Sequence, residues 1–209
     1  MRFQQSWNMG PNPVLNMDQV NEDCQTNLKE IIRYSVNHLG MNHIETARGY
    51  GSSELQIGAA LKSLFENGEM KREDLIIQTK VGAFPTAEQF RKKLEESFTN
   101  LQLDYIDLFS FHGMNMNKHY DLLFNNGENG NCYDVVEEYV KAGKIRHVGF
   151  SSHGAEEVIR RFIETDKFEY ANLHYHFYGS YTATGGGTCG GNLDNIKLMN
   201  QKDMGGTFQ

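Results

Sequence analysis

The chain has 209 residues and a formal net charge of -7, and 39% of its residues are hydrophobic. Only three prolines accompany 21 glycines, which excludes collagen-like and proline-rich disordered proteins. The acidic balance argues against nucleic acid as a partner, and no apolar run is long enough to span a membrane. Cys24, Cys132 and Cys189 are odd in number and far apart, which indicates reduced thiols. Without a signal-peptide pattern, we expect a cytoplasmic protein, with an organelle stroma or matrix as the alternative.

The spacing of apolar residues alternates between two periods along the chain. Runs of β-branched and aromatic residues predict strands, whereas apolar residues three and four positions apart predict amphipathic helices. In chain order, this predicts a helix over residues 18–39, a strand over 42–46, a helix over 52–65, a strand over 75–80, a helix over 86–101 and a strand over 105–112. A helix over 133–142, a strand over 145–151, a helix over 155–165 and a strand over 168–176 follow, then a glycine-rich loop over 177–191 and a polar helix up to 203.

This alternation predicts an α/β fold in which helices cover a parallel sheet. Five predicted strands are each followed by a helix, and one further helix leads them. Neither an internal repeat nor a linker divides the sequence. We therefore expect a single domain over residues 1–209.

Polar residues stand at the carboxyl end of every predicted strand. In parallel α/β folds, reactive groups gather at this end of the strands. A purely structural sheet needs no polar group there, so five in succession predict a functional site. The residues in question are Glu45, Thr46, Lys80, His112, Ser151, Ser152, His153, Asn172, His174 and His176.

Four residues form a chemically coherent set. Lys80 ends an apolar strand, and a lysine buried there would need a carboxylate such as Glu45 on the neighbouring strand. Its positive charge would favour proton release from the phenol of Tyr50, and His112 can donate to a carbonyl oxygen. The set therefore predicts a site for carbonyl reduction. The structural alternatives are a surface lysine, an aromatic plug and a satisfied core histidine.

Three segments resemble signatures of the aldo-keto reductase family. Residues 43–54, HIETARGYGSSE, resemble its signature of an acid-Thr-Ala, two residues, Tyr-Gly and then Ser-Glu. Residues 101–108, LQLDYIDL, are similar to the run before the family's catalytic histidine, and residues 141–151, KAGKIRHVGFS, to its next signature. The three occur in the family's order, and the resemblance covers nearly the whole chain.

The resemblance implies a (β/α)8 barrel of the TIM type and hydride transfer from NADPH to a small-molecule aldehyde or ketone, with NADH as the alternative cofactor. It implies that Tyr50 is the proton donor, that Lys80 tunes it and that His112 steers the carbonyl group. Glu45 would replace the usual aspartate. Because glutamate is one methylene longer, we expect a shifted salt bridge that keeps its charge.

The resemblance also implies residues that hold the cofactor. Ser151 and Asn172 would bind the nicotinamide carboxamide, and Ser152 stands where the family usually has asparagine. Compared with the family, about strands two to six of the barrel are expected here, with the first and the last two strands absent. Such an incomplete barrel exposes two strand edges, and we expect a dimer mate, another partner or further sequence to cover them.

Two other functions stay open. A catalytically inactive, reductase-like fragment would serve a structural or regulatory role in a larger assembly. Alternatively, His174 and His176 share one face of a strand and, with His112, His153 and Glu45, would form the metal site of a barrel hydrolase.

Overall fold

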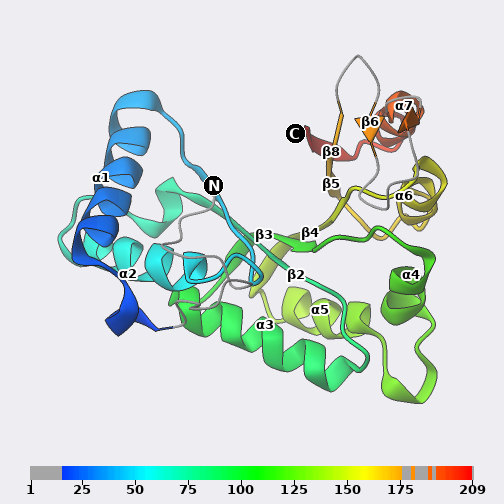
Figure 1. Cartoon of the computed structure of the whole chain (residues 1–209), viewed down its shortest axis with the longest axis horizontal. Coiled ribbons are helices and arrows are strands. Elements are labelled where there is room, and N and C mark those ends of the chain that lie inside the picture. Colours follow the sequence, from blue (N-terminus) through cyan, green and yellow to red (C-terminus); the bar gives the residue numbers. More distant parts are fainter. Residues whose placement is uncertain (1–15, 176–179, 182–187, 190–191, 209) are drawn as a thin grey trace. The chain divides into compact units, whose positions relative to one another are not determined.

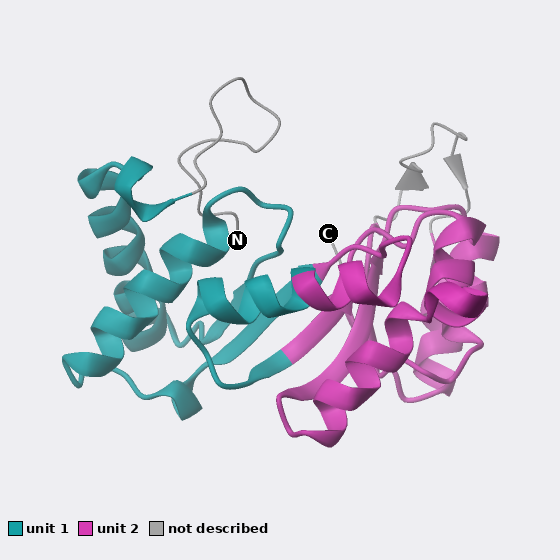
Figure 2. Ribbon diagram, turned by 90° about the horizontal axis from the view of Figure 1, so that it is seen from below, with its two compact units in different colours: residues 1–80, 93–107 teal, residues 81–92, 108–209 magenta. Residues whose placement is uncertain are grey.

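The computed structural model describes residues 16–175, 180–181, 188–189 and 192–208. The chain divides into two compact units, which Figure 2 colours separately. Unit 1 comprises residues 1–80 and 93–107, and unit 2 comprises residues 81–92 and 108–209. Each unit is described by itself below.

Unit 1 is built around two helices that lie side by side, α1 (Glu22–Leu39) and α2 (Ser53–Glu66) (Figure 1). It also contains the short helices η1 (Met17–Gln19) and η2 (Arg72–Asp74), the strand β1 (His43–Glu45), most of β2 (Ile76–Val81) and the second half of α3 (Ala87–Leu101). Burial of the apolar faces of these elements forms one core. Its buried members are Leu28, Ile32, Ile44, Ile57, Ala60, Leu61, Leu64, Met70, Leu75, Ile77 and Leu101.

Local capping fixes where α1 begins and ends. The Asn21 side chain accepts hydrogen bonds from the backbone nitrogens of Asp23 and Cys24, at 2.9 and 3.3 Å. This cap starts the helix at Glu22, later than the predicted start at residue 18. At the other end, Gly40 adopts a φ of +66°, the left-handed conformation that favours glycine and stops the helix as predicted.

Unit 2 surrounds a cluster of aromatic rings. Its helices are α4 (Asn117–Phe124), η3 (Gly127–Asn129), α5 (Cys132–Lys141), α6 (Glu156–Ile163) and α7 (Leu193–Gln201). Its strands are most of β3 (Ile106–Phe111), β4 (Ile145–Ser152), β5 (Tyr170–Leu173), the paired β6 (Ser180–Tyr181) and β7 (Thr188–Cys189), and β8 (Gly205–Phe208). The Phe168 ring lies 5.0 Å from that of Phe150 and 5.9 Å from that of Tyr133, between centres. These contacts anchor β4, β5 and α5 to one another.

The main sheet has six strands in the order β1-β2-β3-β4-β5-β8. The pairs β1–β2, β4–β5 and β5–β8 are parallel, so the predicted alternation of parallel strands and helices is confirmed. Apart from the three short η helices, four elements were not predicted. The paired strands β6 and β7 lie within the segment predicted as a loop over residues 177–191, and the other two are α4 and β8. The helix α4 is short and lies in a polar stretch, and β8 contains two glycines, so it pairs with β5 through its backbone without an apolar alternation. None of the described helices is long and apolar enough to cross a membrane.

The two cysteines whose side chains are described differ in exposure. Cys24 is exposed on α1, whereas Cys132 is buried and its thiol contacts the Phe84 carbonyl oxygen at 3.4 Å. Burial raises the pKa of the Cys132 thiol, and the thiolate is the reactive form. In a Cys189→Ser variant, iodoacetamide is expected to modify Cys24 roughly tenfold faster than Cys132, as measured by peptide mass spectrometry. Equal modification rates of Cys24 and Cys132 in the folded Cys189→Ser variant would contradict this difference in exposure. Unfolding the variant in guanidinium should make the two rates equal.

Candidate active site

Lys80 and Glu45 form a nearly buried ion pair in unit 1. Parallel pairing of β1 with β2 brings the carboxyl ends of the two strands to one edge, with Glu45 opposite Gln78 in register. The Lys80 ammonium donates to a Glu45 carboxylate oxygen. Only 2% of the Lys80 side chain and 20% of the Glu45 side chain are exposed. A charge this deeply buried needs such a partner, so the acid and the lysine belong together structurally.

Tyr50 joins this pair from the loop between β1 and α2. Its side chain is buried, and the Lys80 ammonium nitrogen lies 4.9 Å from the centre of its ring. The backbone nitrogens of Thr46 and Arg48 donate to the carbonyl oxygens of Gln78 and Lys80, each at 2.8 Å. Because these bonds hold the loop along β2, unit 1 by itself brings Tyr50, Lys80 and Glu45 together.

A further acid, Glu54, lies in the first turn of α2. Its side chain is fully buried and accepts hydrogen bonds from Thr79 and Arg48. From the sequence, Glu54 is identified only as part of the signature over residues 43–54. The available signal was its position, four residues before Gly58 and seven before Leu61, which puts it on the buried face of α2.

The remaining predicted residues lie in unit 2, beginning with His112 and Ser151. His112 directly follows β3, and its backbone nitrogen donates to the Val81 carbonyl oxygen at 2.9 Å. The backbone nitrogen of Gly113 donates to the Ser151 hydroxyl at 3.0 Å, and that of Met114 to the Ser151 carbonyl oxygen at 2.8 Å. The end of β4 is therefore tied to the loop that carries His112.

Ser152 and Asn172 differ in how their side chains are used. The Ser152 side chain is fully buried, donates to the Met114 carbonyl oxygen at 2.8 Å and accepts from the Gly154 nitrogen at 3.0 Å. Its hydroxyl thus supports the loop after β4. Asn172, on β5, donates through its amide nitrogen to the Thr207 hydroxyl on β8.

The amide of Asn172 is also held from β3. Its carbonyl oxygen accepts from the Ser110 hydroxyl at 3.3 Å, and Ser110 in turn lies 2.9 Å from the Tyr170 hydroxyl. Asn172 and Ser151 are Cα partners in the parallel register of β4 and β5, and each is 7% exposed. A hydroxyl and a carboxamide therefore stand side by side at the carboxyl ends of two strands.

The metal site of the hydrolase alternative receives no support from the residues described. Among them, no group of three or more His, Cys, Asp and Glu side chains could hold a metal ion. The rings of His153 and His174 lie 5.9 Å apart between centres. His176 lies outside the described residues.

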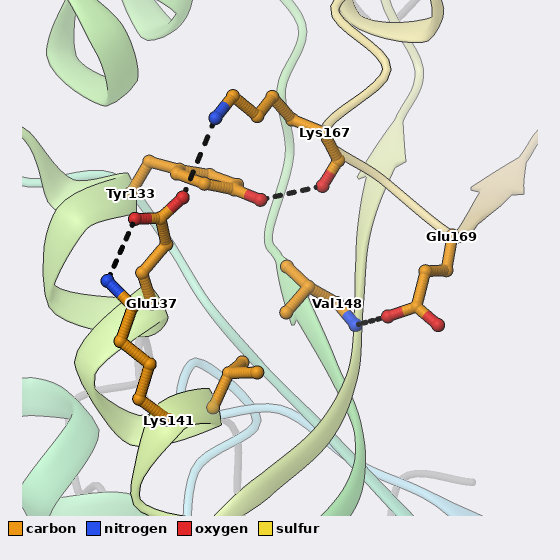
Figure 3. A pocket seen from close by; sticks show the side chains of 7 residues that line it. Tyr133, Glu137, Lys141, Val148, Lys167 and Glu169 are labelled. Carbon is orange, nitrogen blue, oxygen red and sulfur yellow. Dashed lines mark hydrogen bonds and ion pairs between the residues drawn. The ribbon is translucent and has the colours of Figure 1, made fainter.

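A pocket of about 250 Å³ lies in unit 2 (Figure 3), and none of the predicted site residues lines it. Its polar groups bind one another. Glu137 pairs with Lys141 at 3.6 Å and Lys167 at 3.5 Å, while the Tyr133 hydroxyl donates to the Lys167 carbonyl oxygen at 2.8 Å. The pocket is lined by Tyr133, Glu137, Val140, Lys141, Val148, Lys167 and Glu169.

The raised pKa of the Tyr133 phenol agrees with a structural role for this pocket. Burial, followed by the charges of Glu137 and Glu169, raises the pKa of Tyr133 to about 12. The phenol therefore stays protonated and keeps its hydrogen bond to the Lys167 carbonyl oxygen at any ordinary pH. These mutual pairings join α5 to the segment before β5.

The chain matches the sequence model of the aldo/keto reductase family over residues 15–177, more than half of its length. It belongs to the aldo-keto reductase family. The family predicted from the three motifs is thereby confirmed, and the matched segment contains all seven predicted site residues. These are Glu45, Tyr50, Lys80, His112, Ser151, Ser152 and Asn172.

Curated relatives of this aldo-keto reductase chain are considerably longer than it is. The aldo-keto reductase family 1 member C23-like protein of Equus caballus is 32% identical over 130 residues, which are 57% of this chain and 40% of that protein. Dihydrodiol dehydrogenase 3 of Bos taurus is 30% identical over 140 residues, which are 62% of this chain and 43% of that protein. The chain thus spans less than half the length of these relatives.

Solved structures give the fold class. An aldo-keto reductase of Bombyx mori in complex with NADP has a TM-score of 0.63 at 18% identity, over 91% of this chain and 58% of that chain. A putative aldo-keto reductase of Pseudomonas aeruginosa has a TM-score of 0.67 at 21% identity, over 99% of this chain and 69% of that chain. The aldo-keto reductase chain therefore has an incomplete (β/α)8 fold, as predicted, with six strands of its main sheet where five were expected.

Proposed function

We propose that this chain carries the carbonyl-reducing site of an NADPH-dependent aldo-keto reductase, with Tyr50 as the proton donor. Membership of the family supports the reaction class. The observation that carries the assignment is the Lys80–Glu45 ion pair beside the buried phenol of Tyr50. A buried cation near a phenol favours release of the phenol's proton, and general acid catalysis at a carbonyl oxygen uses such a proton.

The proposed reaction divides the work among four residues. Tyr50 gives its proton to the carbonyl oxygen as the carbonyl carbon accepts a hydride, and it regains a proton from water before the next turnover. Lys80 favours this transfer through its charge, and Glu45 keeps that charge in place at a site with little exposure. His112 donates to the carbonyl oxygen and orients the substrate, a small aldehyde or ketone.

Ser151 and Asn172 would hold the nicotinamide carboxamide. NADPH, or NADH as the alternative, supplies the hydride when bound. The two side chains fit an amide because they are register partners, offer a hydroxyl and a carboxamide, and keep a small exposed area. The fully buried Ser152 would act indirectly, through the loop after β4. A cytoplasmic location, and an oligomer or partner that covers the strand edges, belong to the same proposal.

Binding of NADPH tests this proposal most directly. Titration of the purified chain, followed by the fluorescence of NADPH, is expected to give saturable binding with a micromolar Kd. Asn172→Ala should weaken binding roughly tenfold by removing carboxamide contacts, while Asn200→Ala, an exposed asparagine on α7, should leave the Kd unchanged.

The same titration separates the proposal from its alternative. No saturable binding at about 1 mM NADPH would contradict a reductase site in this chain. That result would favour the second hypothesis, a catalytically inactive fragment that serves a larger assembly. A parallel titration with NADH determines the cofactor preference.

A further inference from the structure

Glu54 is a fully buried carboxylate that the proposed reaction does not use. It stands four residues after Tyr50, in the first turn of α2, and its side chain has no exposed area. Burial of a carboxylate is strongly unfavourable unless ion pairs and hydrogen bonds compensate for it. The ion pair and hydrogen bonds of the Glu54 carboxylate therefore indicate which parts of unit 1 this residue holds together.

The partners of Glu54 come from three different segments. Thr79 donates its hydroxyl to one carboxylate oxygen at 2.6 Å. Arg48 donates to the other oxygen at 3.2 Å, and the Asn100 side chain donates to the same oxygen at 3.4 Å. The carboxylate thus connects the loop before Tyr50, the strand β2 and the end of α3.

Two of these partners are close neighbours of the proposed catalytic residues. Arg48 lies two residues before Tyr50, and Thr79 directly precedes Lys80. Glu54 therefore holds the loop from both sides of Tyr50, through its own backbone and through Arg48, and attaches it to the strand of Lys80.

We infer that Glu54 is a positioning residue that fixes the loop over residues 46–53 against β2 and so sets the placement of Tyr50 beside Lys80. The inference rests on the proposed function for the role of Tyr50, but the anchoring itself rests on the contacts of Glu54. The negative charge is also favoured at the amino end of α2 by the helix dipole.

Unit 1 offers a matched control in Asp107. Its carboxylate is also buried, pairs with Arg72 at 2.6 Å and accepts from the backbone nitrogen of Ile77 at 2.9 Å. Both carboxylates thus pair with an arginine and hydrogen-bond to β2. Asp107 does so at the beginning of the strand, whereas Glu54 does so beside Lys80.

Hydrogen exchange of the whole chain compares Glu54→Gln with Asp107→Asn. Glu54→Gln is expected to speed exchange of the amides in residues 46–53 roughly tenfold, because it removes one of the two carboxylates that pair with Arg48, the other being Glu96. Asp107→Asn should leave these amides unchanged and speed exchange around Ile77. Equal acceleration of residues 46–53 in both variants, or none in Glu54→Gln, would overturn the anchoring role.

A milder variant covers the case in which Glu54→Gln does not fold. Thr79→Val keeps the Glu54–Arg48 ion pair and removes one hydrogen bond of Glu54. It is expected to produce a smaller acceleration in the same segment. Unchanged exchange of residues 46–53 in Thr79→Val would count against the inference.

Kinetics test whether the anchoring positions Tyr50 for reaction. In Glu54→Gln, kcat is expected to fall about tenfold and the pH profile of kcat to change, while the KM for NADPH stays within about twofold. Asp107→Asn should keep both kcat and the pH profile at temperatures where it is folded. An active wild type with unchanged kcat and pH profile in Glu54→Gln would refute positioning, whereas an inactive wild type would refute the proposed function and leave hydrogen exchange to decide the anchoring.

Discussion

The Tyr50→Phe variant is expected to lose about 10² to 10⁴ in kcat for the reduction of an aromatic aldehyde. The substitution removes the hydroxyl that would protonate the carbonyl oxygen and keeps the ring that the Lys80 ammonium contacts. Because the ring remains, the fold and the affinity for NADPH should not change. The loss is measured from the decrease in NADPH absorbance at saturating substrate.

Tyr34 provides the control for this substitution. It lies on α1 in the same unit, and 58% of its side chain is exposed. Tyr34→Phe is expected to keep the wild-type kcat. Full activity in Tyr50→Phe would show that another group is the proton donor, while loss in both variants would point to a general effect on the fold.

Gly58→Ala is expected to lower the free energy of unfolding by about 3 kcal/mol, at the upper end of what overpacking costs. A methyl group at Gly58 would overlap the Asn100 carbonyl oxygen and lie 2.9 Å from the Leu101 carbonyl carbon and Cα. These are backbone atoms, so they cannot turn away as a flexible side chain would. The higher helix propensity of alanine, about 1 kcal/mol, offsets only part of this cost.

Urea unfolding followed by circular dichroism measures the effect of Gly58→Ala. The control is Lys62→Ala on the same helix, an exposed position where a change within about 0.5 kcal/mol is expected. If Gly58→Ala were as stable as the wild type, α2 and the end of α3 could not pack as closely as they do in this structure. The same contact brings Asn100 to Glu54, so the substitution should also disturb the anchoring of the Tyr50 loop.

Local sequence patterns predicted much of the fold, because apolar spacing and capping residues act over short distances. Two details were misjudged: one is a local cap inside the segment predicted as a helix, and the other is a strand without apolar alternation. The cap at Asn21 moved the start of α1, and Gly205 and Gly206 gave no strand signal because β8 pairs with β5 through its backbone.

In the candidate site too, some features could be predicted from local sequence rules and others depend on residues distant in the sequence. The rule that parallel strands present their carboxyl ends at one edge was sufficient to predict Glu45 beside Lys80. Helical spacing puts Glu54 on the buried face of α2, but no local pattern could predict the partners that compensate for burying its charge, because Thr79 and Asn100 come from β2 and α3.

Asn172 belongs to a chain of hydrogen bonds in which every donor points the same way. Ser110 has a single hydroxyl proton, which it gives to the Asn172 carbonyl oxygen, so the proton between Ser110 and Tyr170 must come from Tyr170. Donation therefore runs from Tyr170 through Ser110 and Asn172 to Thr207. Because Ser110 and Thr207 are hydroxyls, which can both donate and accept, the orientation of the amide is coupled to the direction of the Ser110–Tyr170 bond: Tyr170 donates in this orientation and would accept in the reversed one. The proton position on the Tyr170 phenol is thus coupled to which end of the Asn172 amide is the acceptor, although Tyr170 bonds to Ser110 and not to the amide.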